Sequence, residues 1–379
     1  MEEQIQAAAR HFEALLREQL ARQERMAQGA ETKDYARAAH IVIGLIDGDG
    51  IGPIIMREAR RAAEKLLQEE IAAGRVELRD ISGLTIENRL ARGEAVPADT
   101  LAQIKECDVL LKGPTTTPKG GTLESANVTL RRELDLYANV RPVTVPGEGI
   151  DWIFFRENTE GEYALGSRGI ELPGALTMDF KVTTDAGTRR IARAAFDYAR
   201  ANGKKNVAVV TKANIMKKTD GMFTRIAHEV AADYPEIECE DWYIDIMTAN
   251  LVNPALRSRF EVFLLPNLYG DIITDEAAQI QGGVGTAGSA NLGGRYAMFE
   301  AIHGSAPRKI ENGEGDFANP ASILKALELL LRHIALPEKA ERLAKALSVC
   351  TESERRVVVT GHRDGATCAA FGDYLLEKL

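Results

Sequence analysis

Short apolar runs alternate, from Ile41 to the C-terminus, with stretches in which apolar residues recur every three or four positions. Runs such as IVIGLI predict buried strands, and the three-to-four-residue period predicts amphipathic helices. The expected strands are 41–46, 76–82, 107–114, 152–158, 205–212, 240–247 and 260–267, and the expected helices are 54–73, 187–202, 219–233, 272–281, 321–335 and 338–348. This alternation predicts an α/β protein built on sheets that helices cover. The glycine-rich stretch 281–296 predicts a close-packed turn region or a domain crossing.

The first 38 residues form a separate segment. Its apolar residues fall on one stripe of a helix: Ile5, Ala8, Ala9, Phe12, Leu15, Leu16 and Leu20. Acidic residues throughout the stretch exclude a transit peptide, and no apolar signal core is present. We expect an N-terminal helical extension, 1–38, that packs on its own domain or on a sister subunit.

Composition restricts the partners of this chain. A length of 379 residues predicts two or three domains. The net charge of −9 argues against nucleic acid and anionic membrane as partners, so any anion site must be a local group of cations. No apolar run is long enough to span a bilayer. The four cysteines are scattered, which predicts a reducing cytoplasm and no structural zinc.

The turn DGDGIGP, residues 47–53, follows the first expected strand. Its glycines are spaced G-x-G-x-G, and the third glycine of a dinucleotide-binding fingerprint would fall at Pro53. Proline suits the first position of a helix, where a missing N–H costs little. The stretch therefore predicts a tight turn and not a standard Rossmann site.

Three carboxylates lie near the ends of expected elements. Asp271 and Asp275 are four residues apart, which places them on one helical face, and Asp245 lies at the end of the expected strand 240–247. Acids near a helix start also complement its dipole, which alone would explain the first two. Carboxylates without nearby histidine or cysteine suit Mg²⁺ or Mn²⁺ rather than zinc.

Candidate acid–base groups follow two other strands. Lys212 and Asn214 come directly after the run VAVV, where open α/β sheets place ligands. Arg156 follows WIFF, and Tyr163 lies a turn beyond. Each has a simpler explanation, since surface lysines and packed tyrosines are common. The stretch FEAIHGSAPRK holds further donors and small residues that suit an extended ligand.

Six segments in order resemble the β-decarboxylating dehydrogenases, the isocitrate and 3-isopropylmalate dehydrogenase family. The segments are KGPTTTP, LRRELDLYANVRP, FRENTEGEY, KANIMK, NLYGDIITD and HGSAP, and the likeness runs from Ile41 to the C-terminus. The resemblance implies the isopropylmalate-dehydrogenase-like two-domain fold, with sheets flanked by helices. It implies a large domain of 39–136 and 283–379, and a small dimerisation domain of 137–282 that includes a clasp arm, 161–184.

The resemblance also implies a role for each motif residue. Arg131, Arg141 and Arg156 would bind substrate carboxylates, and Asp245, Asp271 and Asp275 would hold Mg²⁺ or Mn²⁺. Lys212 would assist removal of the hydroxyl proton as hydride leaves for the nicotinamide, and Tyr163 would protonate the enol formed after CO₂ departs. In the family, Lys212 and Asp245 reach the site from the second subunit, which implies a homodimer with shared active sites.

Substrate choice depends on the stretch from Thr122 to Pro142. Ser125, Asn127 and Arg131 match the pattern S-x-N-x-x-x-R of isocitrate enzymes, and Lys112 could add a cation. A hydroxyl and an amide can hydrogen-bond a third carboxylate, whereas an isopropyl group would leave them unpaired at a cost of about 1–3 kcal/mol. Isocitrate, an intermediate of the tricarboxylic acid cycle, is therefore the expected substrate. Glu124 departs from the basic residue of many relatives, and Arg132 has no assigned role.

Cofactor choice between NADP and NAD rests on the residues after HGSAP. NAD-linked relatives carry Asp and Ile there, whereas Arg308 and Lys309 stand in this chain and would attract a 2′-phosphate. This favours NADP. Val357 and Gly361 occupy the expected positions of a tyrosine–arginine pair of NADP enzymes, which keeps NAD open, although Arg363 could substitute. The expected nucleotide contacts are Thr116, Thr117, Asn214, Glu300, His303, Gly304, Ser305, Ala306, Arg308, Lys309 and Asn319.

The same residues leave other functions open besides isocitrate oxidation. The same fold and mechanism could act on 3-isopropylmalate, homoisocitrate or tartrate. A non-catalytic regulatory subunit would lack a metal aspartate, the lysine or the tyrosine, and all are present. A plain anion-binding module would not need three aspartates opposite the arginines.

Overall fold

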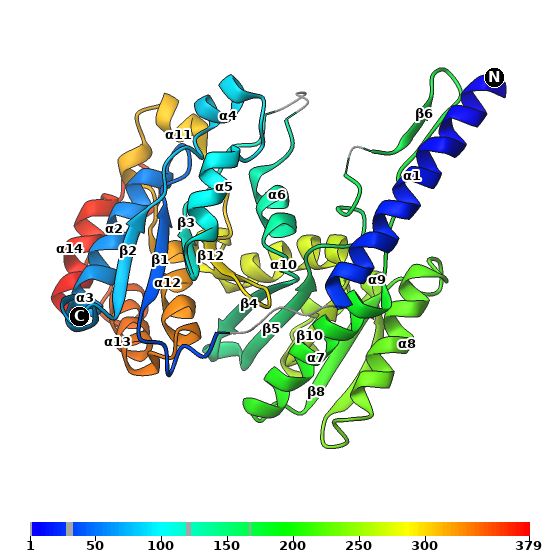
Figure 1. Ribbon diagram of the computed structural model, residues 1–379. Helices are drawn as coiled ribbons and strands as arrows, with labels where there is room; N and C mark the ends of the chain where they lie inside the picture. The colour runs from blue at the N-terminus through cyan, green and yellow to red at the C-terminus, as the bar shows by residue number, and fades with distance from the viewer. Residues whose placement is uncertain (1, 28–32, 119–122, 167) are drawn as a thin grey trace. The chain divides into compact units, whose positions relative to one another are not determined.

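The computed structural model describes every residue except 1, 28–32, 119–122 and 167. The chain divides into two compact units (Figure 1). Unit 1 contains the described parts of Met1–Glu31 together with Tyr137–Ala277, and unit 2 contains those of Thr32–Leu136 and Ala278–Leu379. The predicted α/β class, with sheets flanked by helices, is confirmed.

Unit 2 is built on strands in the order β2 (Val76–Asp80), β1 (Ile41–Ile46), β3 (Val109–Lys112), β12 (Ala297–Ala301) and β11 (Gly288–Leu292). The first four are parallel, and β11 runs antiparallel to β12. Every residue of β1 and β3 is buried, as parallel strands covered on both faces require. The helices of this unit are α2 (Gly52–Leu66), α3 (Gln68–Ala72), α4 (Ile86–Arg92), α5 (Ala98–Lys105), α6 (Ala126–Glu133), α11 (Pro307–Glu311), α12 (Ala321–His333), α13 (Pro337–Ser348) and α14 (Cys368–Lys378).

The glycine turn between β1 and α2 has the conformation that its sequence predicts. Gly48 and Gly50 have φ of +74° and +58°, and a Cβ on Gly50 would lie 2.0 Å from the backbone oxygen of Ser305. A side chain there would collide with backbone, so glycine is required. Pro53 lies in the first turn of α2. The glycine turn therefore packs directly against the backbone of the HGSAP segment.

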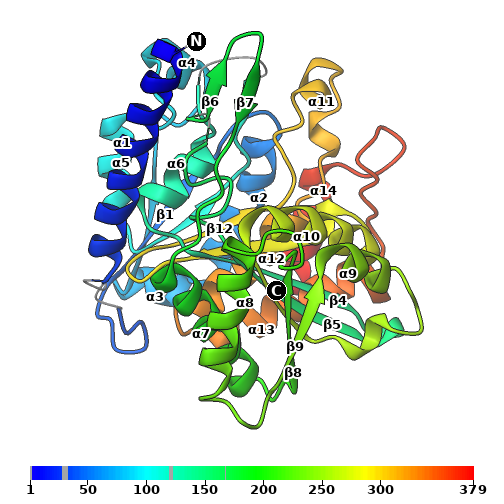
Figure 2. The same ribbon diagram turned by 90° about the vertical axis from the view of Figure 1, so that its right-hand side faces the viewer.

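Unit 1 has strands in the order β4 (Ala138–Val145), β5 (Ile150–Glu157), β10 (Val262–Leu265), β8 (Asn206–Thr211) and β9 (Glu238–Tyr243). β4 and β5 are antiparallel, and β5, β10, β8 and β9 are parallel. Its core includes the stacked rings of Phe154 and Phe263, with centroids 4.3 Å apart. Figure 2 shows α7 (Asp185–Ala201) and α8 (Thr219–Ala231) side by side along these strands. The unit also contains α9 (Ile244–Leu251) and most of α10 (Asn267–Gln281).

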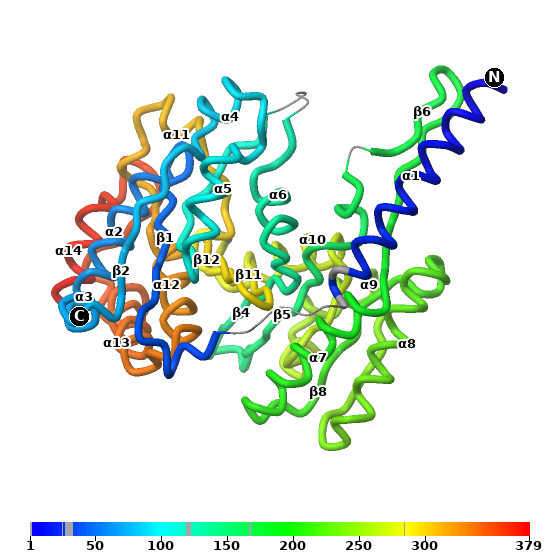
Figure 3. Tube along the Cα trace, in the orientation of Figure 1, coloured from blue at the N-terminus to red at the C-terminus, as the bar shows by residue number. Residues whose placement is uncertain are grey.

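The N-terminal helix α1 (Glu2–Ala27) packs on unit 1 beside the hairpin of β6 (Ile170–Leu172) and β7 (Leu176–Met178), which lies in the segment expected to be the clasp arm (Figure 3). Leu15 is buried, and the rings of Phe12 and Phe180 lie 5.4 Å apart. Other residues of the expected stripe, including Ile5 and Leu20, are exposed. The helix therefore has one face on unit 1 and a second, apolar face toward solvent.

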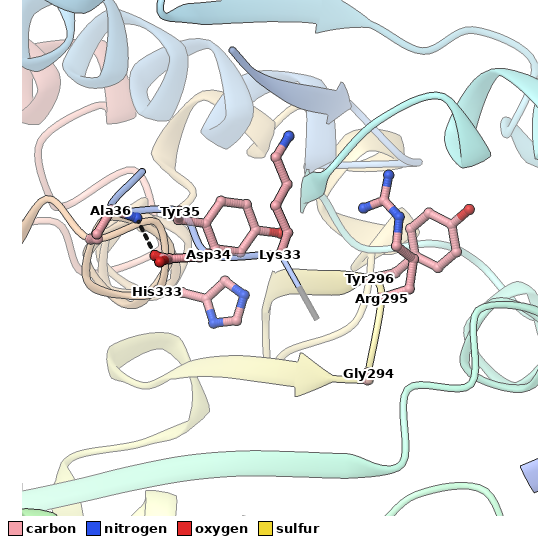
Figure 4. Close-up of a pocket in the computed structure, with 10 residues that line it drawn as sticks. Lys33, Asp34, Tyr35, Ala36, Gly294, Arg295, Tyr296 and His333 are labelled. Atoms are coloured by element: carbon pink, nitrogen blue, oxygen red, sulfur yellow. Dashed lines mark hydrogen bonds between the residues drawn. The ribbon is translucent and has the colours of Figure 1, made fainter. Parts of the chain in front are cut away.

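The segment after residue 32 attaches to unit 2 instead. Lys33 forms an ion pair of 2.7 Å with the buried Asp108, and the Tyr35 hydroxyl donates to the backbone oxygen of Asp108. Figure 4 shows the Tyr35 ring facing His333, beside a cavity of about 290 Å³ that Arg295 also lines. The extension expected over 1–38 is thus a helix on unit 1 followed by a short non-helical segment on unit 2.

Three expected elements need correction. The helix expected over 54–73 is broken at Leu67, where φ is −100° and the side chain is fully buried, giving α2 and α3. The helix expected over 272–281 begins at Asn267. The strand expected over 240–247 ends at Tyr243, and α9 then buries Met247, Asn250 and Leu251 with a helical period.

The glycine-rich stretch 281–296 is not only a turn region, since it contains strand β11. A Cβ on Gly288 would lie 2.5 Å from the backbone nitrogen of Ala326 in α12, so the small residues allow a helix to pack closely on the strand. The close packing was predicted and the strand was not. Strands β4 and β12 were also missed, because β4 contains a proline and both mix polar with apolar residues.

Candidate functional site

Arg156 lies near the end of β5 and is almost fully buried. Its Nε and Nη2 donate to Oδ1 of Asn267 at 2.9 and 2.7 Å, and Nη1 pairs with Asp271 Oδ1 at 2.5 Å. A Cβ on Gly270 would lie 2.5 Å from Arg156 Cγ, so the helix backbone passes directly against this side chain. The guanidinium is therefore held in one orientation from two sides.

Tyr163 meets the same carboxylate. Its hydroxyl donates to Asp271 Oδ2 at 2.7 Å, and the Arg156 guanidinium lies 5.4 Å from its ring centroid. One carboxylate oxygen of Asp271 thus accepts a hydrogen bond from Arg156, and the other accepts one from Tyr163. The structure brings together three of the residues that the motifs predicted.

Arg141 joins this group from β4. Its Nη1 donates to Thr274 Oγ1 at 2.6 Å and to Asp275 Oδ1 at 3.2 Å, and its Nη2 lies 3.8 Å from Asp271 Oδ1. Asp271 and Asp275 share one face of α10, as their spacing predicted, but they lie inside the helix and not in its first turn. Complementing the helix dipole therefore does not explain them.

Lys212 and Asp245 form a second pair in unit 1. Lys212 follows β8, and its Nζ lies 2.7 Å from Asp245 Oδ1, in the first turn of α9. The Lys212 hydrogen bond lowers the pKa of the Asp245 carboxyl, and the Asp245 side chain remains largely exposed. The carboxylate is therefore ionised and open to a further ligand.

The predicted metal ligands fit a hard cation in their chemistry. Asp245, Asp271 and Asp275 offer carboxylate oxygens and are each partly or largely exposed, which suits Mg²⁺ or Mn²⁺. Among the residues that the structure describes, no three His, Cys, Asp or Glu side chains gather as a metal site. Asp271 and Asp275 lie together, and Asp245 lies with Lys212. One copy of the chain thus supplies two separate parts of the expected set.

Glu300 on β12 gathers two of the predicted cations in unit 2. Lys112 Nζ lies 3.3 Å from Glu300 Oε2, and Arg131 Nη2 donates to Glu300 Oε1 at 3.0 Å. Burial opposes ionisation of Glu300, but the charges of Lys112 and Arg131 prevail and lower its pKa to about 2. Lys112 is fully buried and also donates to the Gly113 oxygen. Arg131 keeps its buried Nε without a hydrogen-bond partner among the described residues, so it retains a donor for a ligand.

Ser125 and Asn127 stand at the start of α6. Ser125 is the residue before the helix and its side chain makes no capping hydrogen bond, while Asn127 Oδ1 accepts from Thr115 Oγ1 at 3.0 Å. The bond to Thr115 fixes the amide oxygen and leaves its NH₂ group as a donor. Arg132, without a role in the motifs, binds both oxygens of Glu124 at 3.0 and 2.9 Å. The acidic Glu124, where many relatives have a basic residue, is thus paired with Arg132 of α6.

Several predicted nucleotide contacts meet around the glycine turn. Thr116 Oγ1 lies 2.6 Å from Ser305 Oγ, and Asp49 of the turn accepts from the Thr116 N–H at 2.7 Å. Thr117 and Gly304 are exposed nearby in sequence, and Ala306 has φ of +45°. The structure therefore joins the KGPTTTP and HGSAP segments.

The remaining expected contacts are dispersed. His303 Nδ1 lies 3.0 Å from the Gly304 oxygen, and burial lowers its pKa. Asn319 accepts from the N–H of Ala321 at the start of α12, and Asn214 is exposed after β8 in unit 1.

Three cations lie in α11 or beside it. Arg308 is exposed in this helix, and Lys309 donates to the Gly361 oxygen. Arg363 Nη2 donates to the oxygens of Asn312 and Gly313, at 3.1 and 3.2 Å. The segment 357–363 therefore returns to the helix that follows HGSAP. Arg363, which could substitute for the missing tyrosine–arginine pair, contacts the end of this helix.

Sequence reasoning missed two residues that orient the site. Asn267 fixes Arg156, and Thr274 accepts from Arg141. Both lie in the NLYGDIITD segment, so the motif contained them, but neither has a charge or a spacing that singles it out. Only the contacts across the strands reveal their roles.

Comparison with known proteins identifies the family of this chain. Residues 42–375 match the family model for isocitrate/isopropylmalate dehydrogenase. The chain is 38% identical to a probable isocitrate dehydrogenase [NAD] subunit alpha of Caenorhabditis elegans, over 87% of this chain and 89% of the relative. It is 41% identical to the chloroplastic 3-isopropylmalate dehydrogenase of Solanum tuberosum, over 80% of this chain and 83% of the relative.

A solved structure of isocitrate dehydrogenase from Methylococcus capsulatus superposes with a TM-score of 0.79 at 36% identity, covering 89% of this chain and 99% of that one. The resemblance predicted from the ordered motifs is confirmed. The fold, the motif contacts and these similarities lead to one conclusion: the chain belongs to the isocitrate/isopropylmalate dehydrogenase family.

Proposed function

We propose that this enzyme catalyses the metal-dependent oxidative decarboxylation of isocitrate to 2-oxoglutarate, with reduction of NADP or NAD. The observation that supports isocitrate over an alkyl-substituted malate is the polar start of α6. Ser125 makes no capping hydrogen bond, and the Asn127 amide is oriented by Thr115. These donors suit a third carboxylate, and an isopropyl group would leave them unpaired.

The residues would divide the reaction as follows. Three arginines bind the substrate carboxylates: Arg131, Arg141 and Arg156. In the structure they pair with Glu300, Asp275 and Asp271, and the substrate carboxylates would take the place of these partners. Lys212 takes the proton of the substrate hydroxyl as the hydride leaves. After the β-carboxylate departs as CO₂, Tyr163 gives its phenol proton to the carbon that carried it. Asp245, Asp271 and Asp275 would hold Mg²⁺ or Mn²⁺, which when bound supplies Lewis acidity at the substrate oxygens.

The enzyme is proposed to act as a homodimer in which each site uses both chains. Asp245 lies with Lys212, apart from the Asp271 and Asp275 pair, so a second copy is the natural source of the third carboxylate. Large apolar residues near the Lys212–Asp245 pair are 46–67% exposed: Ile215, Tyr243 and Ile246. Exposed apolar side chains of this size indicate an interaction surface.

The cysteines support a reducing cytoplasm as the compartment. All four carry free thiols, and Cys107, Cys350 and Cys368 are buried. Among the described residues, no helix has the length and apolar character needed to cross a membrane.

An absorbance assay of reduced nicotinamide tests the substrate directly. We expect turnover of isocitrate with Mn²⁺, and little turnover of 3-isopropylmalate, homoisocitrate or tartrate at the same concentration. An excess of chelator should abolish turnover, because the carboxylates alone cannot polarise the substrate hydroxyl. Activity with isopropylmalate and none with isocitrate would overturn the substrate assignment. Turnover unchanged by chelator would overturn the proposed metal requirement.

The nucleotide preference is tested at Arg308. We propose that NADP is preferred, because Arg308, Lys309 and Arg363 put positive charge around α11. Arg308→Asp should lower the NADP-to-NAD ratio of kcat/KM by about tenfold or more, since it removes a charge-assisted hydrogen bond and adds repulsion of the 2′-phosphate. Steady-state kinetics with both nucleotides measure the ratio. Lys345→Asp, an exposed cation on α13, is the matched control and should leave the ratio unchanged. If Arg308→Asp leaves the NADP-to-NAD ratio of kcat/KM unchanged, Arg308 does not recognise the nucleotide.

A further inference from the structure

Arg22 of the N-terminal helix contacts the FRENTEGEY segment, which carries the proposed catalytic groups. Its Nη2 donates to Thr159 Oγ1 at 3.2 Å and to Glu160 Oε1 at 3.3 Å. The Arg22 side chain is only 16% exposed and that of Glu160 is 4% exposed. The family match begins at residue 42, so helix α1 lies outside it. A residue of the extension therefore contacts the FRENTEGEY motif.

The segment that Arg22 contacts holds two buried carboxylates. Glu157 accepts from the N–H groups of Thr159 and Glu160, the latter at 2.6 Å. Glu160 accepts from the N–H and the hydroxyl of Thr184, at 2.9 and 2.5 Å. Burial and the charge of Glu160 raise the pKa of Glu157 to about 7. Two neighbouring buried carboxylates require compensating cations.

Arginines on two helices face these carboxylates. Arg22 comes from α1, and Arg190 comes from α7 and donates to Thr159 Oγ1 at 3.1 Å. Thr159 in turn donates its hydroxyl to Glu157 Oε1 at 2.7 Å. Both arginines thus stabilise the conformation of the turn 157–161, which follows β5.

Hydrogen bonds continue from this turn to the site. The backbone oxygen of Glu160 accepts from Asn267 Nδ2 at 3.0 Å. The other end of the same amide, Asn267 Oδ1, accepts from Nε and Nη2 of Arg156, which pairs with Asp271. A Cβ on Gly161 would lie 3.1 Å from Asn267 Cβ, so turn and helix are in close contact. A shift of Glu160 therefore moves the amide that orients Arg156.

We propose that Arg22 is a positioning residue, through which the N-terminal helix holds the turn 157–161 and thereby orients Arg156 and Tyr163. This inference rests on the proposed function, because it assigns Arg156 to a substrate carboxylate and Tyr163 to proton donation. It gives the extension a role in the reaction, beyond packing.

Removal of Arg22 should leave the helix attached. Arg168 pairs with Glu18 at 2.6 Å, His11 contacts the Arg168 oxygen at 2.9 Å, and Leu15 is buried. These contacts lie on the same helix and do not involve Arg22. A substitution at Arg22 thus tests the role of its guanidinium group while α1 stays attached to unit 1.

The test compares Arg22→Ala, Arg22→Lys and Arg17→Ala in the full-length enzyme. Arg17 is exposed on the same helix and pairs only with Glu13 among the interactions seen for it, so it is the matched control. Arg22→Ala should lower kcat/KM for the diacid by about tenfold or more, as small displacements of substrate-positioning groups do. The KM for the nucleotide should stay within twofold of wild type. Arg22→Lys should recover part of the loss, because lysine keeps the charge but not the fork.

Hydrogen exchange gives a readout that does not depend on the substrate. In Arg22→Ala, the amides of Thr159 and Glu160 should exchange about tenfold faster. Both amides donate to the Glu157 carboxylate, and Arg22 helps to hold that carboxylate in place through the Thr159 hydroxyl. Amides of α12 should be unchanged, and Arg17→Ala should resemble wild type in every measurement.

The outcomes separate this inference from the proposed function. If the enzyme oxidises another diacid, the Arg22→Ala defect should persist with that substrate, which supports the positioning role and overturns only the substrate. Wild-type exchange at Thr159 and Glu160, together with kcat/KM within twofold of wild type, would overturn the role of Arg22. An equal defect in Arg17→Ala would overturn it as well, because the effect would then belong to the helix surface.

Discussion

A heterodimer of one Tyr163→Phe chain and one Lys212→Gln chain is expected to recover about half of the wild-type activity, although each variant homodimer should lose at least about a hundredfold in kcat. The reason is geometric. Tyr163 and Asp271 are joined by a 2.7 Å hydrogen bond, while Lys212 and Asp245 form their own pair. If each site takes one pair from each chain, the heterodimer has one site with both substitutions and one with neither. Two affinity tags allow the heterodimer to be purified and assayed.

The matched control combines two substitutions from the same pair. A heterodimer of Tyr163→Phe and Asp271→Asn should stay inactive, because each of its two sites then carries one substitution. Tyr163→Phe with Asp245→Asn should behave like the Lys212 combination. Recovery in the Asp271 heterodimer, or none in the Lys212 heterodimer, would falsify the shared-site arrangement.

Asp271→Asn is expected to have the second-largest effect, a loss of at least about a hundredfold in kcat/KM, because polarisation by a metal ion is worth several kcal/mol. Asp271 is also the partner of both Arg156 and Tyr163, so the substitution weakens the orientation of a buried guanidinium and of the phenol. Asparagine has nearly the same shape but lacks the charge. Affinity for Mn²⁺ in the presence of substrate, measured by electron paramagnetic resonance, should fall together with turnover.

Glu276→Gln supplies the control for Asp271→Asn. It removes a carboxylate from the next turn of the same helix, and burial already raises the pKa of Glu276. Its kcat/KM and its affinity for Mn²⁺ should remain within about threefold of wild type, as for substitutions outside a site. Wild-type metal affinity in Asp271→Asn would exclude this carboxylate as a ligand.

The periodic parts of the fold were predictable because burial repeats along them. β1 and β3 are buried throughout, and their apolar runs predicted them. Elements with weak periodicity were misplaced: β4 contains a proline, β11 consists largely of small residues, and α9 begins inside an apolar run that also suits a strand. In each of these, pairing with a distant strand or packing of a helix decides the conformation.

The candidate site was predictable as a set of residue types and only partly as a set of contacts. The motifs indicated Arg156, Tyr163 and Asp271, and the structure joins them. They did not indicate that Lys112 and Arg131 share Glu300, or that Asn267 holds Arg156. Asn267 carries no charge and does not stand out along the chain. Glu300 was expected to contact the nucleotide, and its pairs with Lys112 and Arg131 depend on strand β12, which was not predicted.

By itself the sequence determined the family, the α/β class, the tight glycine turn and the donors available for carboxylates, a cation and a nucleotide. The family follows from the resemblance of six ordered motifs. The class, the turn and the donors follow from residue types and from spacings of a few positions, which local geometry constrains. Only the tertiary structure decided which donors meet: Arg156 with Asp271 across 115 positions, Lys112 with Glu300 across 188, and Arg22 with Glu160 across 138. Such pairs depend on strand order and helix packing, which a pattern along the chain does not encode.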